Sequence, residues 1–180
     1  MTTNPVRRQV LRALGGLVLA PVSVRQPGDG QGTHSHPVQH DLLAAMEESA
    51  LLQIDFTEMH EVVSAMGNAP PVCAVLHGPD VGTVVNQFGD VLAQHHYPFN
   101  AVLVVVSGNQ SIRLDHCRAV FAAVTDATVN SASTKAGGCD ATRTARNRLQ
   151  SGLYAPPMVL HGVVVDAAIT NRIRVTVLAG

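Results

Sequence analysis

The sequence predicts an α/β domain of three layers, with helices on both faces of a mostly parallel sheet of about five strands. Three observations favour this class. The 180 residues suffice for one domain core and are few for two. Hydrophobic residues make up 46% of the chain but aromatic residues only 3%, so the core is aliphatic, as in sheets buried on both faces. Strand-like and helix-like segments alternate over residues 41–180, which we take as the domain.

The first 24 residues have the layout of a twin-arginine export signal. Arg7 and Arg8 precede an apolar stretch of about eight residues that ends at Ala20. This stretch is too short to cross a bilayer as a helix, so we predict no stable membrane span. Export by this route predicts a periplasmic or secreted bacterial protein. The alternative is an amphipathic N-terminal helix of a cytoplasmic protein.

Residues 25–40 have the composition of a flexible linker. They are rich in Gly, Gln, Pro and His and show no hydrophobic period. His34, His36 and His40 are residues that Zn²⁺, Cu²⁺ or Ni²⁺ can bind. A flexible segment does not fix the geometry of metal ligands, so the linker interpretation is preferred to a metal site.

The first part of the domain is predicted to be helix, strand and helix. Residues 41–48 form a short helix or the lead-in to a strand, and residues 51–56 form a strand. From Thr57, which we take as a helix cap, apolar residues recur at helical spacing as far as Gly67.

A buried strand is predicted over residues 72–76, where five apolar residues run without interruption up to the turn His77-Gly78-Pro79. Sheets of α/β proteins bind their ligands at such strand ends. Residues 80–94 follow as an amphipathic helix.

The second half of the domain is harder to assign. The order of elements predicts a helix over residues 101–106, although runs rich in Val prefer strands. Residues 125–140 are rich in Ser, Thr, Ala and Gly and are predicted to form a loop or lid. The other predicted elements are a strand over 111–114, a helix over 118–124, a helix over 141–150, a strand over 157–160, a helix over 162–171 and a strand over 174–178.

Charge and motifs exclude several classes of function. Beyond residue 30 the chain has eight basic and twelve acidic residues, a balance that does not suit nucleic-acid binding. The basic cluster Arg143, Arg146 and Arg148 has the pattern of a solvated helix face. The sequence lacks the motifs of dinucleotide enzymes, P-loop NTPases, zinc proteases and common serine hydrolases, so no cofactor is predicted.

Three stretches between about residue 50 and residue 180 resemble the DsrE/F-like family. Residues 72–79 are similar to its V-V-x-H-G-P segment. Residues 98–117 are similar to the stretch that ends at the family cysteine, and residues 160–177 to the closing Gly-Val segment and last strand. The chain departs from the family pattern at Asn109, at Arg118-Ala119 and in the last strand, which lacks a Tyr.

The resemblance implies a role for Cys117, because the matching cysteine carries a persulfide in sulfur-relay members. The residues give separate support, since Cys117 follows a predicted strand, lies beside His116 and Arg118, and would begin a helix; these features stabilise thiolates. His77 or His116 would tune this thiol. The alternatives are a buried Cys117 or a disulfide with Cys139, and a turn-capping role for His77. Cys73 is expected in the core.

Two functions follow from different classes. The first is sulfur relay or thiol-redox chemistry through Cys117, which predicts a solvent-reachable thiol with a lowered pKa and a sulfur-carrier partner. The second is a non-catalytic small-ligand-binding or assembly protein, which predicts a buried or disulfide-bonded Cys117. The resemblance also implies a homo-oligomer.

Overall fold

The computed structural model describes residues 37–67, 71–93, 99–134, 157–170 and 172–180. The predicted signal, Arg143, Arg146, Arg148 and Cys139 lie outside these residues, as does the predicted helix over 141–150. In chain order the described elements are α2 (Pro37–Ala45), α3 (Phe56–Ala65), β1 (Val72–Gly78), α4 (Val81–Ala93), β2 (Ala101–Gly108), α5 (Leu114–Thr134), β3 (Met158–Val165) and β4 (Ile173–Ala179).

The four described strands form one mixed sheet in the order β1-β4-β2-β3. Strand β4 pairs antiparallel with both β1 and β2, whereas β2 and β3 pair in parallel. The predicted α/β class is confirmed, but the prediction of a mostly parallel sheet is wrong. Two strands that follow each other in the chain can run parallel in one sheet only if a crossover of about a dozen residues or more, usually a helix, connects them. The link from Val165 at the end of β3 to Ile173 at the start of β4 is shorter, so β4 runs in the opposite direction to β3.

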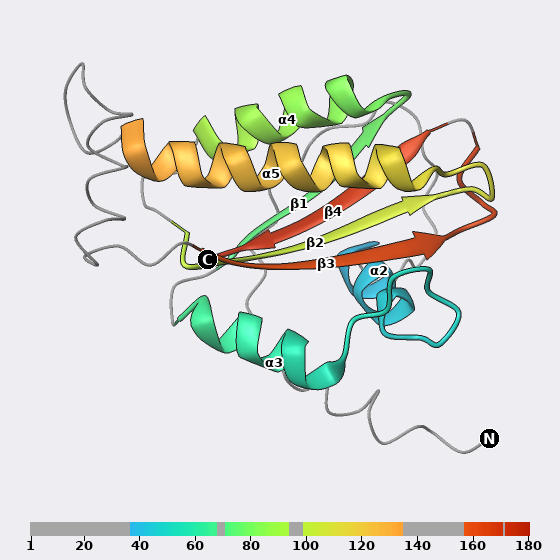
Figure 1. Cartoon of the computed structure of the whole chain (residues 1–180), viewed down its shortest axis with the longest axis horizontal. Coiled ribbons are helices and arrows are strands. Elements are labelled where there is room, and N and C mark those ends of the chain that lie inside the picture. The colour runs from blue at the N-terminus through green and yellow to red at the C-terminus, as the bar shows by residue number, and fades with distance from the viewer. Residues whose placement is uncertain (1–36, 68–70, 94–98, 135–156, 171) are drawn as a thin grey trace.

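Helices cover both faces of the sheet. Figure 1 shows α4 and α5 above the sheet and α2 and α3 below it. Side chains of β2 alternate between the two layers: Val102, Val104 and Val106 pack under α4 and α5, and Leu103 and Val105 pack on the other face. Every residue of β2 is buried, which explains why residues 101–106 are apolar without a break.

The run predicted as a helix over 101–106 is a strand, and so is the first part, 162–165, of the run predicted as a helix over 162–171; residues 166–170 contain a turn. Residues 101–106 belong to β2, because a strand covered on both faces has no polar alternation to distinguish it from a buried helix. Strand β3 continues through Gly162 to Val165. A Cβ atom at Gly162 would lie 2.7 Å from Ile54 Cδ1 and 3.1 Å from Ala45 Cβ, so the close approach of α2 and the segment after it explains this glycine.

Residues before β1 also differ from the prediction. The segment 51–56 is no strand; it makes one bridge, between Leu52 and Val163. Asp55, and not Thr57, caps α3, in a capping box with Glu58. Helix α2 begins at Pro37, so residues 37–40 of the predicted linker are helical.

Helix α5 is longer than predicted. It begins at Leu114, so the segment 111–114 is a turn leading into a helix rather than a strand. It continues to Thr134, through more than half of the predicted loop over 125–140. None of the helices in the described ranges is long and apolar enough to cross a membrane.

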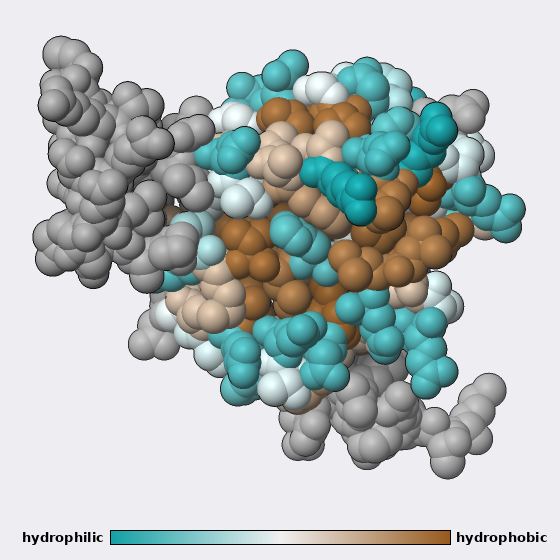
Figure 2. All heavy atoms as spheres, viewed as in Figure 1, coloured by the Kyte–Doolittle hydropathy of each residue, from teal (hydrophilic) through white to brown (hydrophobic). Residues whose placement is uncertain are grey.

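Strand β3 is an edge strand of the described sheet. In Figure 2, apolar atoms gather between the two helical layers, at the level of β3 in Figure 1. The large apolar side chains that are exposed include Leu51, Leu52 and Met158. Apolar surface is therefore concentrated beside the edge strand β3, to which Leu52 is bridged.

Candidate functional site

A cavity of about 230 Å³ opens where β1 and β2 end. The loops after both strands, the first turns of α4 and α5, and the start of β4 form its walls. The lining residues are Pro79, Asp80, Val81, Gly108, Asn109, Ser111, Ile112, His116, Arg172 and Ile173. This is the strand-end position at which the sequence predicted a ligand.

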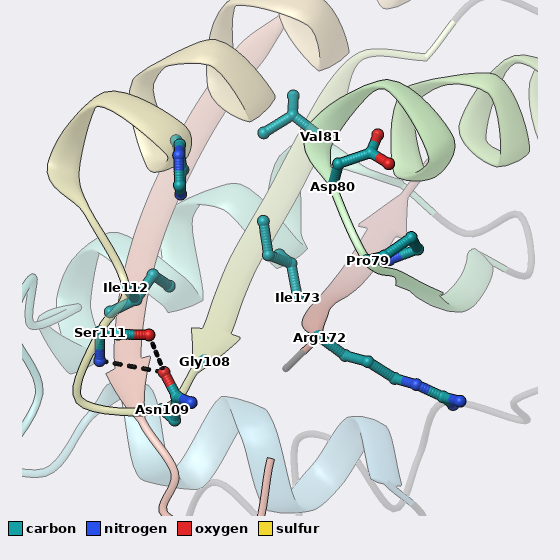
Figure 3. A pocket seen from close by; sticks show the side chains of 10 residues that line it. Pro79, Asp80, Val81, Gly108, Asn109, Ser111, Ile112, Arg172 and Ile173 are labelled. Carbon is teal, nitrogen blue, oxygen red and sulfur yellow. Dashed lines mark hydrogen bonds between the residues drawn. The ribbon is translucent and has the colours of Figure 1, made fainter. Parts of the chain in front are cut away.

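One side of the cavity is apolar. Figure 3 shows Val81, Ile112 and Ile173 pointing toward a common space between the strand ends. Ile173 belongs to the core under α4 and α5, and Val81 and Ile112 pack against it. A Cβ atom at Gly108 would lie 2.8 Å from Ile112 Cδ1, so the glycine allows the loop to fold back and place Ile112 in the wall.

Asp80 fixes the start of α4 beside the cavity. Its Oδ1 accepts the Thr83 N–H at 2.9 Å, and its Oδ2 accepts the Thr83 hydroxyl at 3.1 Å. These are the bonds of a helix N-cap. Hydrogen bonds from the Thr83 backbone and side chain lower the pKa of Asp80 below 3.8, so the carboxylate is charged at neutral pH and engaged with its own helix.

Asn109 fixes the opposite wall. Its Oδ1 accepts the Ser111 N–H at 2.9 Å and the Ser111 hydroxyl at 2.6 Å, and its carbonyl accepts the Ile112 N–H at 3.0 Å. A side chain that closes such a turn holds the loop without regular secondary structure. The Gly108-Asn109 pair is therefore the local sequence pattern that indicates the turn in this wall.

Three polar groups at the cavity have no partner within the described part of the chain. They are the Asn109 amide nitrogen, the His116 ring and the Arg172 guanidinium. The sequence singled out His116, but as a neighbour of Cys117. Arg172 and Asn109 were not predicted as site residues, because they lie 63 positions apart in the sequence. They line the same cavity only because β4 lies between β1 and β2 in the sheet.

Cys117 does not line the cavity. Its side chain is 1% exposed and packs in the core under α4 and α5. Burial raises the pKa of the Cys117 thiol. It is a free cysteine in the structure, so its state is that of a buried thiol, as the binding-protein hypothesis expects. Cys73 is also buried and free, and burial raises its pKa to about 12, which confirms its predicted place in the core.

His77 is not among the residues that line the cavity. Its N–H donates to Gln87 Oε1 at 3.2 Å, and its carbonyl accepts from Gln87 Nε2 at 2.9 Å, which ties the end of β1 to α4. Leu76 packs under α4 and α5, so alternation along β1 puts the His77 side chain on the other face of the sheet. The sheet therefore separates His77 from Cys117, and the three predicted residues do not form one site.

No metal centre is formed by the described residues, which contain no group of three or more His, Cys, Asp or Glu placed to hold an ion. His40 lies on α2, with its Nδ1 3.4 Å from Asp41 Oδ1. His34 and His36 lie outside the described residues, so metal binding by the histidine tract stays a hypothesis.

The fold is similar to that of FtsZ from M. jannaschii. The structure described as "FtsZ dimer, empty" matches with a TM-score of 0.53 and 15% identity, over 77% of this chain and 34% of that one. A point mutant of the same protein matches with a TM-score of 0.52 and 16% identity, over 79% and 36%. This chain thus spans about a third of the FtsZ chains, and at such identity the likeness shows the fold alone. No protein-family model and no curated protein matches this sequence.

Proposed function

We propose that this chain is a small-ligand-binding α/β domain, with its ligand in the cavity at the ends of β1 and β2. One observation carries the proposal: Asn109, His116 and Arg172, whose polar groups lack partners in the described chain, line the same cavity as the apolar side chains of Val81, Ile112 and Ile173. Ligand sites combine an apolar lining with a few placed polar groups, and α/β sheets bind ligands at this edge. A catalytic step is not part of the proposal.

The size of the cavity limits the ligand. Sites for drug-sized molecules have volumes of about 300–1,000 Å³. At about 230 Å³ this cavity lies below that range. The ligand is therefore a small metabolite, or the small end of a larger molecule that extends through the mouth.

Sulfur relay or thiol-redox chemistry through Cys117, with a sulfur-carrier partner, is the second hypothesis, and it rests on the resemblance to the DsrE/F-like family. It requires a thiol that solvent and a partner can reach. A Cys117 that is 1% exposed, with a raised pKa, meets this requirement only if the start of α5 opens. The burial of Cys117 is the reason why we place ligand binding first.

We also propose, on the same resemblance, that the domain is DsrE-like. Its support is the position of His77-Gly78-Pro79 at the end of β1, beside the cavity, and a sheet covered by helices on both faces. Export through a twin-arginine signal, a periplasmic location and a homo-oligomer stay predictions. Cell fractionation and light scattering of the purified protein test them.

Methyl-group NMR on the full chain tests ligand binding. Titration with a library of small metabolites is expected to produce saturable shifts at Val81, Ile112 and Ile173. Asn109→Ala should weaken these shifts, because it removes an open donor and loosens the loop. Asn86→Ala, on the exposed side of α4, is the matched control and should leave them unchanged.

Shifts confined to other parts of the protein would contradict this site. Equal titration curves for Asn109→Ala and Asn86→Ala would contradict the role given to the polar wall.

A further inference from the structure

The hydrogen-bonding groups of the cavity are unequally satisfied, and the imbalance indicates the chemistry of the ligand. We infer that the cavity selects a small carboxylate with a short aliphatic body. This inference rests on the proposed function, since it assigns a ligand class to the same cavity.

The side-chain oxygens of Asp80 and Asn109 at the cavity already accept hydrogen bonds. Both carboxylate oxygens of Asp80 accept from Thr83, and Asn109 Oδ1 accepts from Ser111 twice. Figure 3 shows the Asp80 carboxylate turned toward α4 and away from Ile173. A ligand that offers mainly donors would therefore have to displace bonds that hold the two walls.

The donors at the cavity are open. The Asn109 amide nitrogen and the Arg172 guanidinium can only donate, and neither has a partner in the described part of the chain. The His116 ring supplies a third polar group. Donors of this kind are best satisfied by an anionic acceptor, because charge-assisted hydrogen bonds are about twice as strong as neutral ones.

Arg172 is placed to supply the charge. Arg172 is one of the residues that line the cavity, and in Figure 3 its side chain extends away from Ile173. The exposed stem gives it freedom to close over an anion, and its planar fork matches a carboxylate in two-point geometry. A cationic ligand would meet this charge and leave the open donors without acceptors.

The apolar wall specifies the rest of the ligand. Val81, Ile112 and Ile173 are branched aliphatic residues, and no Phe, Tyr or Trp is among the described residues that line the cavity. An aliphatic chain buries its surface against such a wall, at about 25 cal/mol per Å². An inorganic anion such as phosphate would leave this wall uncovered, so we expect it to bind more weakly than a carboxylate of four to six carbons.

The test uses matched pairs of small molecules with the full chain. Hexanoate, hexanamide and inorganic phosphate are titrated at pH 7, with the methyl groups of Val81, Ile112 and Ile173 as reporters. Hexanoate is expected to bind roughly tenfold or more tightly than hexanamide, which has the same shape and no charge. Arg172→Gln should remove most of this difference, and Arg118→Gln, on the exposed face of α5, should not.

The outcomes separate the two proposals. If hexanamide binds as well as hexanoate at these methyl groups, the ligand site stands and the selection for carboxylates is overturned. If phosphate binds best, the aliphatic part of the inference is overturned. If neither these probes nor the metabolite library perturbs the three residues, the proposed function itself fails and the inference fails with it.

Discussion

The guanidinium of Arg174 on β4 binds the carboxylate of Asp41 on α2 at two points, although the residues are 133 positions apart. Asp41 is completely buried, and the Thr176 hydroxyl donates to the same carboxylate. Arg174 also reaches Asp166 Oδ2, at 3.0 Å. This cluster anchors α2 to the strand that lies between β1 and β2, on the face of the sheet opposite α4 and α5.

Removal of Asp41 is therefore expected to be strongly destabilising. Asp41→Ala leaves the buried Thr176 hydroxyl without its acceptor and leaves the partly buried Arg174 with Asp166 as its remaining partner, and the loss is expected to cost about 3 kcal/mol. The free energy of unfolding in urea measures the loss. Asp126→Ala, on an exposed position of α5, is the control and should change the stability by less than about 0.5 kcal/mol. Equal effects of the two substitutions would show that the pair does not anchor α2.

The close approach at Gly162 gives a second prediction. Gly162→Ala places a methyl group 2.7 Å from Ile54 Cδ1 and 3.1 Å from Ala45 Cβ, and the overpacking is expected to cost about 1–3 kcal/mol. Gly89→Ala is the matched control, because Gly89 lies on an exposed position of α4 and has no atom within 4 Å of the added Cβ. It should stabilise the protein by about 0.5–1 kcal/mol. Thermal unfolding of both variants should therefore give shifts of opposite sign.

These two contacts show where the sequence is informative and where it is not. The strand over 72–76 and the helix after it were predictable, because a buried run and an amphipathic run are local patterns. The insertion of β4 between β1 and β2 has no local signal. The ion pair of Asp41 with Arg174 depends on that position of β4, and so does the presence of Arg172 and Asn109 in the lining of one cavity.

The sequence did not indicate which of its candidate site residues lie together, for the same reason. His77, His116 and Cys117 lie near strand ends and helix starts in the sequence, as site residues often do. Which way each side chain points is decided by alternation along β1 and by the rotation of α5, and these put His77 and Cys117 on opposite sides of the sheet. Only His116 reaches the cavity, so one of the three predicted residues lies where a ligand can bind.

His161 is expected to make the stability of the protein depend on pH. Its ring stacks on Phe121 with the centroids 4.1 Å apart, and its Nε2 is buried without a hydrogen-bond partner in the described structure. Burial lowers the pKa of His161 below 6.5, so the folded state favours the neutral ring. Below about pH 6.5 the unfolded chain binds the proton more readily, and the stability contributed above that pH is lost as the pH falls.

His161→Phe should remove part of this dependence. The substitution keeps a ring against Phe121 and eliminates the unpaired nitrogen, so stability at pH 7.5 is expected to be unchanged or higher. Urea midpoints at pH 7.5 and pH 5.5 should differ less for His161→Phe than for the native chain. His60→Phe, on the exposed side of α3, should retain the native difference. A native-like difference in His161→Phe would show that other groups cause the loss.

The reactivity of Cys117 decides between the two functions that the sequence left open. With its thiol buried and its pKa raised, Cys117 is expected to react with iodoacetamide at pH 8 roughly tenfold or more slowly in the folded chain than in urea. Cys73→Ser and Cys139→Ser are introduced together, so that Cys117 is the thiol observed. Its rate is compared with that of a cysteine at the exposed position 119, made by Ala119→Cys in a chain that also carries Cys117→Ser.

The two possible rates have different consequences for function. If Cys117 reacts slowly with iodoacetamide and the thiol at position 119 reacts quickly, the first turn of α5 stays closed. Cys117 is then a structural residue of the core, in agreement with the ligand-binding proposal. A Cys117 that reacts as quickly as the exposed control means that α5 opens readily at its start. The thiol would then be available to a sulfur donor, and sulfur relay would become the better account of the protein. Because His116 lies in the same turn, such opening would also disturb the cavity, and methyl shifts at Ile112 would reveal it.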